Sequence, residues 1–335
     1  MLSKYGIFDT VPFACLVPQP VSSRTFKSSN YLLAFRAFEE KLRDENFDEG
    51  GLGGKLPGYF IVTATQELIR WHVATVGGDS LSAWLPFHRV MGQIHNLPEN
   101  KYNHGDIGTF AELLWSSGKT VKGKELCSIL NAALREDDPT MVMHAVVISI
   151  ALNTRRVSDR GATTGLFSGI NPKEYPQKLA KNDMGFGRPA PHSFWHGSWR
   201  GGGFRDRFQE FYKPGRRYRV PGVLATALKK QVALDFIVKS DTKHPRILWC
   251  IRVDGRGVQH IEHRIMHASF VHKSLYPREA EFLYAAYSAF QVESVIWATP
   301  DRTGKYTIGQ YHQVLIRAAK DNKQWPEDLL LAPWY

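Results

Sequence analysis

The apolar residues of this chain follow two different periods, and the change between them constrains the fold more than any other feature. Residues 246–254 alternate apolar and other side chains, which places the apolar ones on one face of a half-buried β-strand. Residues 31–43 instead repeat apolar side chains every three or four positions, which is one face of a helix. The two sets are Ile247, Trp249, Ile251 and Val253, and Leu32, Phe35, Phe38 and Leu42.

Other segments show the same two apolar periods, helical in the first half of the chain and strand-like in the second. Helical apolar spacing recurs in residues 125–135 and 141–152. Asp138 with Pro139 suits the N-cap and first turn of the second of these helices. Strand patterns follow at residues 282–284, 290–297 and 306–316. Between residues 155 and 195, Pro, Gly, Lys and Asn dominate, which predicts a long irregular excursion.

Two carboxylates, Glu279 and Glu281, follow a Tyr276-Pro277 turn and precede an apolar run. Residues i and i+2 of a strand share a face, so both acids can converge on one substrate if the extended geometry begins at or before Glu279. One carboxylate can then stabilise a developing sugar cation while the other orients or deprotonates a nucleophile. Taken alone, the pair fits a charged, solvated strand edge better than a catalytic site.

Two elements lie upstream of this pair. The first is Arg200 followed by three glycines, 201–203. Arg200 offers a charged fork for a diphosphate, and glycines let a ligand approach the backbone closely, although a solvated Gly-rich loop has the same composition. A Rossmann fingerprint is excluded because the glycines neither follow an apolar strand nor precede an apolar helix.

The second element is the small-residue turn Ala225-Thr226-Ala227, which precedes helical spacing in residues 229–239. Thr226 suits the N-cap of this helix. The apolar face that the helix would bury comprises Val232, Ala233, Phe236 and Ile237.

In this order, the three elements resemble the ADP-ribosyltransferases of the arginine–serine–glutamate class, which includes the cholera-type and clostridial binary toxins. The resemblance covers roughly residues 195–300. It implies an α+β fold in which two sheets form a mixed sandwich, with NAD bound as a substrate in the cleft between them. Residues 1–150 would then be a mainly helical N-terminal region, and residues 151–335 the ADP-ribosyltransferase-like catalytic domain.

The resemblance also implies roles for individual residues. Arg200 would brace the NAD cleft, and the backbone at Gly201 and Gly202 would hold the nicotinamide carboxamide. Glu281 would bind the ribose and stabilise an oxocarbenium-like transition state. Glu279 would engage the guanidinium of the acceptor, because a glutamate at this position is associated with arginine as the target.

The remaining residues match the pattern of the family less well. Tyr276 resembles an aromatic residue that contacts the acceptor, although a turn aromatic packed on the surface would look the same. The family usually has Ser-Thr-Ser where this chain has Ala225, Thr226 and Ala227 in the cofactor site. The first serine hydrogen-bonds the catalytic glutamate, and a methyl group cannot. Either a neighbouring hydroxyl or a water replaces it, or the active site is weakened.

We therefore expect an NAD-dependent mono-ADP-ribosyltransferase that modifies arginine on a protein and hydrolyses NAD when no acceptor is present. The alternative is a catalytically weak or inactive binding protein of the same fold. It would use a basic surface that includes Arg216, Arg217 and Arg219 to contact nucleic acid or acidic partners.

Charge, cysteine content and hydropathy restrict the partners, the metal sites and the location that either function would have. The formal net charge is +11, and its densest cluster, residues 213–219, either lies at the mouth of the cleft or is a solvated basic face. Three widely separated cysteines argue against a disulfide framework, and the histidines show no paired spacing, so no metal site is expected. The first 20 residues make a poor signal peptide, and no apolar run is long enough to span a membrane. The chain is expected in the cytoplasm, or as a toxin-like effector delivered into a host cell by a non-classical route.

Overall fold

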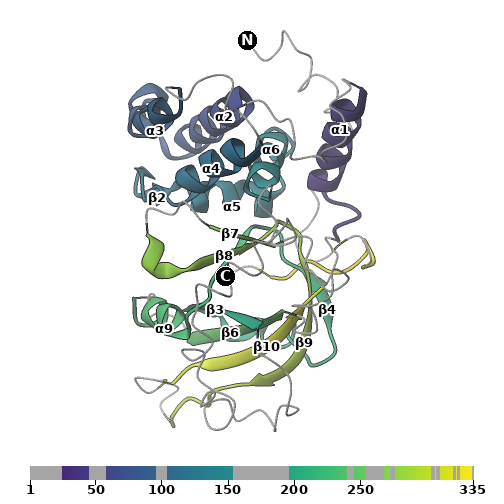
Figure 1. Ribbon diagram of the computed structural model, residues 1–335. Helices are drawn as coiled ribbons and strands as arrows, with labels where there is room; N and C mark the ends of the chain where they lie inside the picture. Colours follow the sequence, from purple (N-terminus) through teal and green to yellow (C-terminus); the bar gives the residue numbers. More distant parts are fainter. Residues whose placement is uncertain are drawn as a thin grey trace.

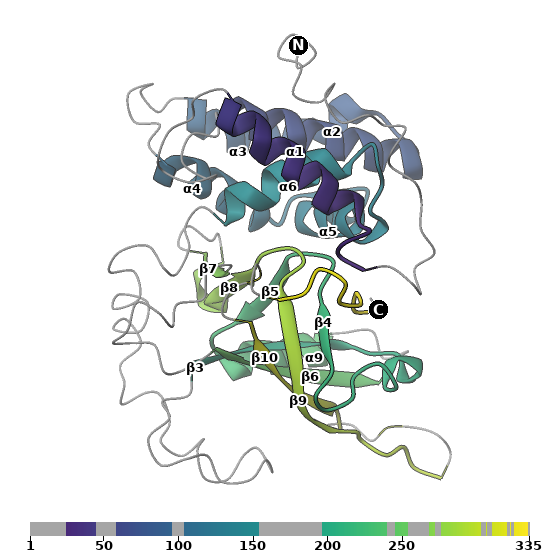
Figure 2. The same cartoon turned by 90° about the vertical axis from the view of Figure 1, so that its right-hand side faces the viewer.

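The computed structural model describes residues 25–44, 58–95, 104–153, 196–239, 245–253, 268–271, 276–302, 310–319 and 325–333, with Tyr306 and Asn322. The excursion predicted for residues 155–195 lies outside this set. In the described part, a layer of helices covers one side of a β-sheet, and the helices come almost entirely from the first half of the chain (Figures 1 and 2).

The helical layer surrounds helix α6, all of whose residues are buried. Its neighbours α1, α2, α4 and α5 each pack directly against it. No helix in the described residues is long and apolar enough to cross a membrane. The elements of this layer are α1 (Asn30–Asp44), α2 (Gly58–Val76), α3 (Ser80–His95), α4 (His104–Trp115), β1 (Thr120–Val121), β2 (Lys124–Glu125), α5 (Leu126–Glu136) and α6 (Val142–Leu152).

Aspartate side chains accept backbone hydrogen bonds between α5 and α6, although the N-cap residue of α6 is Met141, which has no side-chain cap, and not Asp138 as predicted. Asp138 accepts hydrogen bonds from the backbone N–H groups of Thr140 and Met141, at 2.8 and 3.2 Å, at the start of α6. Asp137 ends α5 in the left-handed conformation, with φ of 54°. Its carboxylate accepts from the backbone N–H groups of Asn30 and Tyr31, so one residue ends α5 and caps α1.

The sheet has eight strands in the order β4-β9-β10-β6-β3-β5-β8-β7. Strands β6 and β10 are parallel, and all other neighbours are antiparallel. The strands are β3 (His196–Gly203), β4 (Arg217–Arg219), β5 (Leu224–Ala227), β6 (Arg246–Val253), β7 (Ala268–Phe270), β8 (Glu281–Tyr284), β9 (Ala289–Ile296) and β10 (His312–Ala318). Helix α9 (Lys230–Lys239) packs on β3 and β6. The predicted α+β class with an N-terminal helical region is confirmed.

The two parts of this sheet share a single pair of register partners. Strand β3 pairs with β6 along its whole length, but it pairs with β5 only between Trp199 and Ala227. Beyond that pair the strands diverge, so β5, β8 and β7 form a smaller sheet at an opening beside β3. The two sheets implied by the resemblance are thus joined in strand pairing at one pair of residues, Trp199 and Ala227.

Strands β5 and β8 separate two hydrophobic cores. Leu283 and Val223 pack with the helices, whereas Phe282 and Leu224 pack in a second core against β6, β9 and β10. Because side chains alternate along a strand, Glu281 shares the helix-facing side with Leu283. The sheet therefore directs the carboxylate of Glu281 towards the helical layer.

Two sequence-based expectations need correction. Thr226 is not a helix N-cap, because it lies within β5 and α9 begins only at Lys230; its buried hydroxyl donates to the carbonyl of Phe282 at 2.7 Å. Strand β6 is buried on both faces rather than one, because α9 covers the side that carries Leu248.

The glycine at position 201 is required by helix packing. A Cβ atom there would lie 1.9 Å from the carbonyl oxygen of Ala233 in α9, whereas a Cβ at Gly202 would meet nothing within 4 Å.

We expect Gly201→Ala to lower the free energy of unfolding by about 1–3 kcal/mol, because α9 must shift. Gly202→Ala is the matched control on the same strand and should have little effect. Guanidinium unfolding of both variants measures the difference, and equal stabilities would contradict the packing explanation.

Candidate active site

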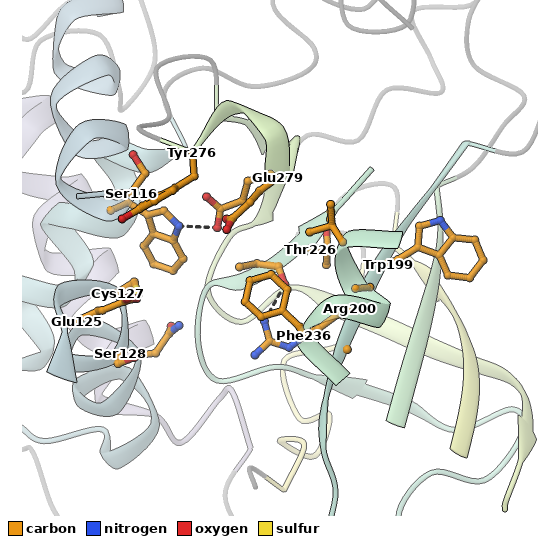
Figure 3. Close-up of a pocket in the computed structure, with 18 of the residues that line it drawn as sticks. Ser116, Glu125, Cys127, Ser128, Trp199, Arg200, Thr226, Phe236, Tyr276 and Glu279 are labelled. Atoms are coloured by element: carbon orange, nitrogen blue, oxygen red, sulfur yellow. Dashed lines mark hydrogen bonds between the residues drawn. The ribbon is translucent and has the colours of Figure 1, made fainter. Parts of the chain in front are cut away.

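A pocket of about 490 Å³ lies between the helical layer and the diverging strands β3 and β5 (Figure 3). Both halves of the chain contribute to its wall. The helical layer provides Trp115, Ser116, Gly118, Glu125, Cys127, Ser128, Asn131 and Arg135. The sheet, its loops and α9 provide Trp199, Arg200, Gly201, Ala225, Thr226, Ala227, Val232, Ala233, Phe236, Tyr276, Glu279 and Glu281.

The pocket brings together every site residue predicted from the sequence except Gly202. The three sequence elements are far apart along the chain, yet Arg200, Ala225 and Glu281 share one cavity. Figure 3 shows Glu279 and Tyr276 on one side of the cavity and Glu125 and Cys127 of the helical layer on another. The roles suggested for these residues remain predictions.

The two glutamates reach the pocket by a different route from the one predicted. Residues Pro277–Glu279 form a 3₁₀ turn, and strand β8 begins only at Glu281. Ala280 between them is left-handed, with φ of 46°, a conformation that costs an alanine roughly 1–2 kcal/mol. The strand alternation invoked for Glu279 is therefore wrong. A turn and one strained residue place both acids on the same cavity.

Glu281 is the most perturbed acid of the pocket. Burial raises its pKa to about 7, and the nearby carboxylates of Glu279 and Glu125 act in the same direction. The indole of Trp115 donates a hydrogen bond to Glu281 Oε1 at 2.8 Å, and this bond and the charge of Arg200 both lower the pKa of Glu281. Burial also raises the pKa of Glu279. Glu281 is thus a carboxyl group that titrates near neutral pH inside a cavity.

Two arginines line the same pocket. Arg200 donates from Nη1 to the carbonyl of Ala225 at 2.7 Å, which directs its guanidinium across the opening between β3 and β5. Arg135 enters from α5, and burial, together with the charge of Arg200, lowers its pKa to about 10, so it stays protonated at neutral pH. The cavity therefore combines two cations with the carboxylates of Glu125, Glu279 and Glu281.

The helical layer contributes residues to the pocket that were not predicted from the sequence. Glu125 and Arg135 lie in the segment 125–135, whose apolar spacing predicts a helix and whose polar residues resemble surface positions, and no prediction was made for the segment that contains Trp115. The hydrogen bond between Trp115 and Glu281 spans 166 positions of the chain, so no local pattern could reveal it. Cys127 also lines the pocket, but burial raises its pKa to about 12, which keeps it a neutral thiol. The described residues contain no group of three potential metal ligands.

The basic cluster of residues 213–219 does not border this pocket. Strand β4, which carries Arg217 and Arg219, lies at the other edge of the sheet from β5 and β8. Arg219 is 1% exposed, and its guanidinium donates to the carbonyls of Tyr287, Asn322 and Trp325 at 3.0, 2.9 and 2.9 Å. The prediction that this cluster lies at the mouth of the cleft is therefore wrong, and Arg219 holds the C-terminal segment instead.

No protein-family model and no curated protein matches the chain. Many solved structures show distant similarity to the chain, and three of them serve as examples. One is the ADP-ribosyltransferase Vis of Vibrio splendidus, in complex with an inhibitor, at 12% identity over 77% of this chain and 84% of Vis, with a TM-score of 0.38. Another is exoenzyme S of Pseudomonas aeruginosa, bound to carba-NAD and human 14-3-3 protein beta, at 16% identity over 76% and 89%, with a TM-score of 0.34. The third is the type III effector XopAI of Xanthomonas axonopodis pv. citri, at 12% identity over 91% and 96%, with a TM-score of 0.40.

The raised pKa of Glu281 predicts a pH-dependent stability. Its folded pKa of about 7 lies above the ordinary 4.5, so the folded state favours the protonated acid. As the pH rises from 4.5 to 7, the unfolded chain ionises first and the wild type loses stability. Glu281→Gln does not ionise, so its free energy of unfolding relative to wild type should increase across this window by on the order of 1–3 kcal/mol.

Denaturant unfolding at a series of pH values measures this effect. Glu40→Gln, which removes an exposed carboxylate of α1, is the control and should track the wild type. Parallel pH profiles for Glu281→Gln and wild type would contradict a desolvated Glu281.

Proposed function

We propose that this protein is a mono-ADP-ribosyltransferase that transfers ADP-ribose from NAD to an arginine side chain of an acceptor protein. In the absence of acceptor, water would take its place and NAD would be hydrolysed. The observation that carries the proposal is the convergence of Arg200, Glu279 and Glu281 on one cavity, with Glu281 desolvated and hydrogen-bonded.

The cavity suits a dinucleotide in size and in charge. Its volume of about 490 Å³ falls in the range of small-molecule sites, roughly 300–1,000 Å³. Arg200 and Arg135 are permanently charged forks, which match the geometry of phosphate oxygens. The opening between β3 and β5 exposes the strand next to Gly201, so the backbone there remains the candidate for holding the nicotinamide amide. We propose Ala225 and Thr226 as neighbours of the same ligand.

Glu281 would act on the donor. When the bond between nicotinamide and ribose C1 breaks, nicotinamide leaves with the electron pair and positive charge develops on the ribose. An ionised carboxylate in a water-poor cavity stabilises such a charge strongly, because it is fixed in place and little water screens it. The pKa of about 7 makes the active, ionised form the major one above neutral pH.

Glu279 would act on the acceptor. A carboxylate accepts a forked pair of hydrogen bonds from guanidinium, which orients one nitrogen towards ribose C1. That nitrogen forms the new C–N bond, and its proton passes to Glu279, whose burial-raised pKa makes it a better proton acceptor. Tyr276, half exposed at the same rim, is proposed to contact the acceptor protein.

The alternative is a weak or inactive protein of this fold. It is favoured by Ala225, which offers no hydroxyl to Glu281, and by Thr226, whose hydroxyl is bonded to the carbonyl of Phe282. A nucleic-acid surface at β4 would have to rely on Arg216 and Arg217, since Arg219 is buried. Absence of nicotinamide release would favour this alternative.

Two wider assignments belong to the same proposal. We divide the chain into a helical region, residues 1–150, and a catalytic domain, residues 151–335, with the pocket drawing on both. We also propose that the protein acts on host proteins as a toxin-like effector, since Vis and XopAI carry such descriptions. Incubating the protein with labelled NAD and a host lysate tests the proposal that it modifies host proteins, because modified proteins would carry the label.

Substitution of each glutamate separates the two proposed roles. Glu281→Gln should lower nicotinamide release from NAD by about 10²-fold or more, because the charge that stabilises the transition state is lost. Glu279→Gln should lower transfer to an arginine acceptor about 10²-fold while NAD hydrolysis falls less than about tenfold. Wild-type release should rise with pH through about 7, as Glu281 ionises.

Released nicotinamide and labelled acceptor are quantified in the same reactions, with Glu40→Gln as the control. NAD should also raise the melting temperature of the wild type, because a ligand that binds only the folded state stabilises it. A wild type that neither releases nicotinamide nor gains stability from NAD is not an NAD-dependent transferase.

A further inference from the structure

A tryptophan of the helical layer contacts the proposed catalytic acid directly. Trp115 is the last residue of α4, its side chain is buried in the helical core, and its Nε1 atom lies 2.8 Å from Glu281 Oε1. An indole N–H can only donate, so this contact favours the ionised form of the carboxylate. The bond crosses from the helical layer to the small sheet.

The neighbouring strand offers no comparable donor. Ala227 is the register partner of Glu281, and Ala225 is the next residue on the same face of β5. Thr226 between them faces the second core, where its hydroxyl donates to the carbonyl of Phe282. Side chains on the Glu281 face of β5 are therefore methyl groups.

We propose that Trp115 is the positioning residue of Glu281, with its indole N–H holding one carboxylate oxygen in place of a hydroxyl from β5. This inference rests on the proposed function of Glu281. It also assigns a role to the helical region, which would complete the active centre instead of only covering the sheet.

The surroundings of Trp115 suit a fixed donor. The end of α4 is tied back by Ser116, whose backbone N–H and hydroxyl both donate to the carbonyl of Glu112, at 2.9 and 2.8 Å. Ser117 adds a hydrogen bond to the carbonyl of Leu114 at 3.3 Å. A donor that is held by packing and by its own helix end keeps its direction without ordering cost during the reaction.

Charged groups reach Glu281 from several elements. Glu279 of the 3₁₀ turn and Glu125 of β2 raise the pKa of Glu281, while Arg200 of β3 and the Trp115 hydrogen bond lower it. Cys127 of α5 also faces the site as a neutral thiol, and Arg135 of α5 shares the cavity. Removing only the indole N–H should therefore shift the titration of Glu281 upwards.

The test compares Trp115→Phe with Trp84→Phe in the full chain. Phenylalanine keeps a ring in the core and removes the donor, and Trp84 is a similarly buried tryptophan of the same core with no place in the pocket. We expect Trp115→Phe to lower kcat for nicotinamide release about ten- to a hundredfold, the effect of losing a hydrogen bond to a charged group. KM for NAD should change less than about threefold, and the acid limb of the pH profile should move to higher pH.

Two further measurements separate positioning from packing. A serine introduced by Ala227→Ser lies opposite Glu281, so in the Trp115→Phe background it should recover part of kcat and return the acid limb towards neutral pH. The pKa of the Glu281 carboxyl in ligand-free protein, followed by ¹³C NMR, should rise in Trp115→Phe and stay unchanged in Trp84→Phe.

The outcomes distinguish this inference from the proposed function. An active wild type with the same kcat, pH profile and Glu281 titration in Trp115→Phe would overturn the role of Trp115. Equal losses of kcat in Trp115→Phe and Trp84→Phe, with no change in the Glu281 titration, would also overturn it. A wild type that releases no nicotinamide would instead overturn the proposed function, whatever the NMR titration shows.

Discussion

The placement of strands β5 and β8 between two hydrophobic cores is the constraint on which the pocket depends. Their odd and even residues must satisfy different neighbours, so Phe282 packs with the large sheet and Leu283 packs with the helices. A shift of one residue would exchange these faces and would drive Glu281 into an apolar core. The packing of Leu283 therefore fixes the direction of Glu281, before any hydrogen bond forms.

That direction has an electrostatic cost, which the helical layer partly offsets. A carboxylate turned towards a packed layer loses water, and burial is the main reason why the pKa of Glu281 is about 7. Trp115 of this layer donates one hydrogen bond to Glu281, and Arg200 of β3 contributes positive charge. Both lower the pKa of Glu281. The result is an acid that ionises near neutrality, which is the range in which a carboxylate can change protonation state during catalysis.

Apolar periodicity predicted helices and strands well where the segment has a single clear period. The buried residues of α5, which are Leu126, Ile129, Leu130, Ala133 and Leu134, repeat at the helical spacing that the sequence indicated. Patterns failed where a residue had two compatible local roles. Thr226 has the chemistry of an N-cap and of a strand residue, and only the pairing of β5 with β8 decided between them. Gly201 suited a ligand, yet its missing side chain is explained by the approach of α9.

The sequence by itself determined that helices dominate the first half and strands the second, and it identified Arg200, Glu279 and Glu281 as candidate site residues, but it predicted neither α2, α3 and α4 nor strand β3. The features that it did predict depend on periodicity and on short motifs, which are readable along the chain. Only the tertiary structure decided that Glu279 arrives through a 3₁₀ turn, that Arg219 is buried, and that Trp115 meets Glu281 from 166 positions away. These features depend on packing between distant segments, and packing leaves no local periodic signal in the sequence.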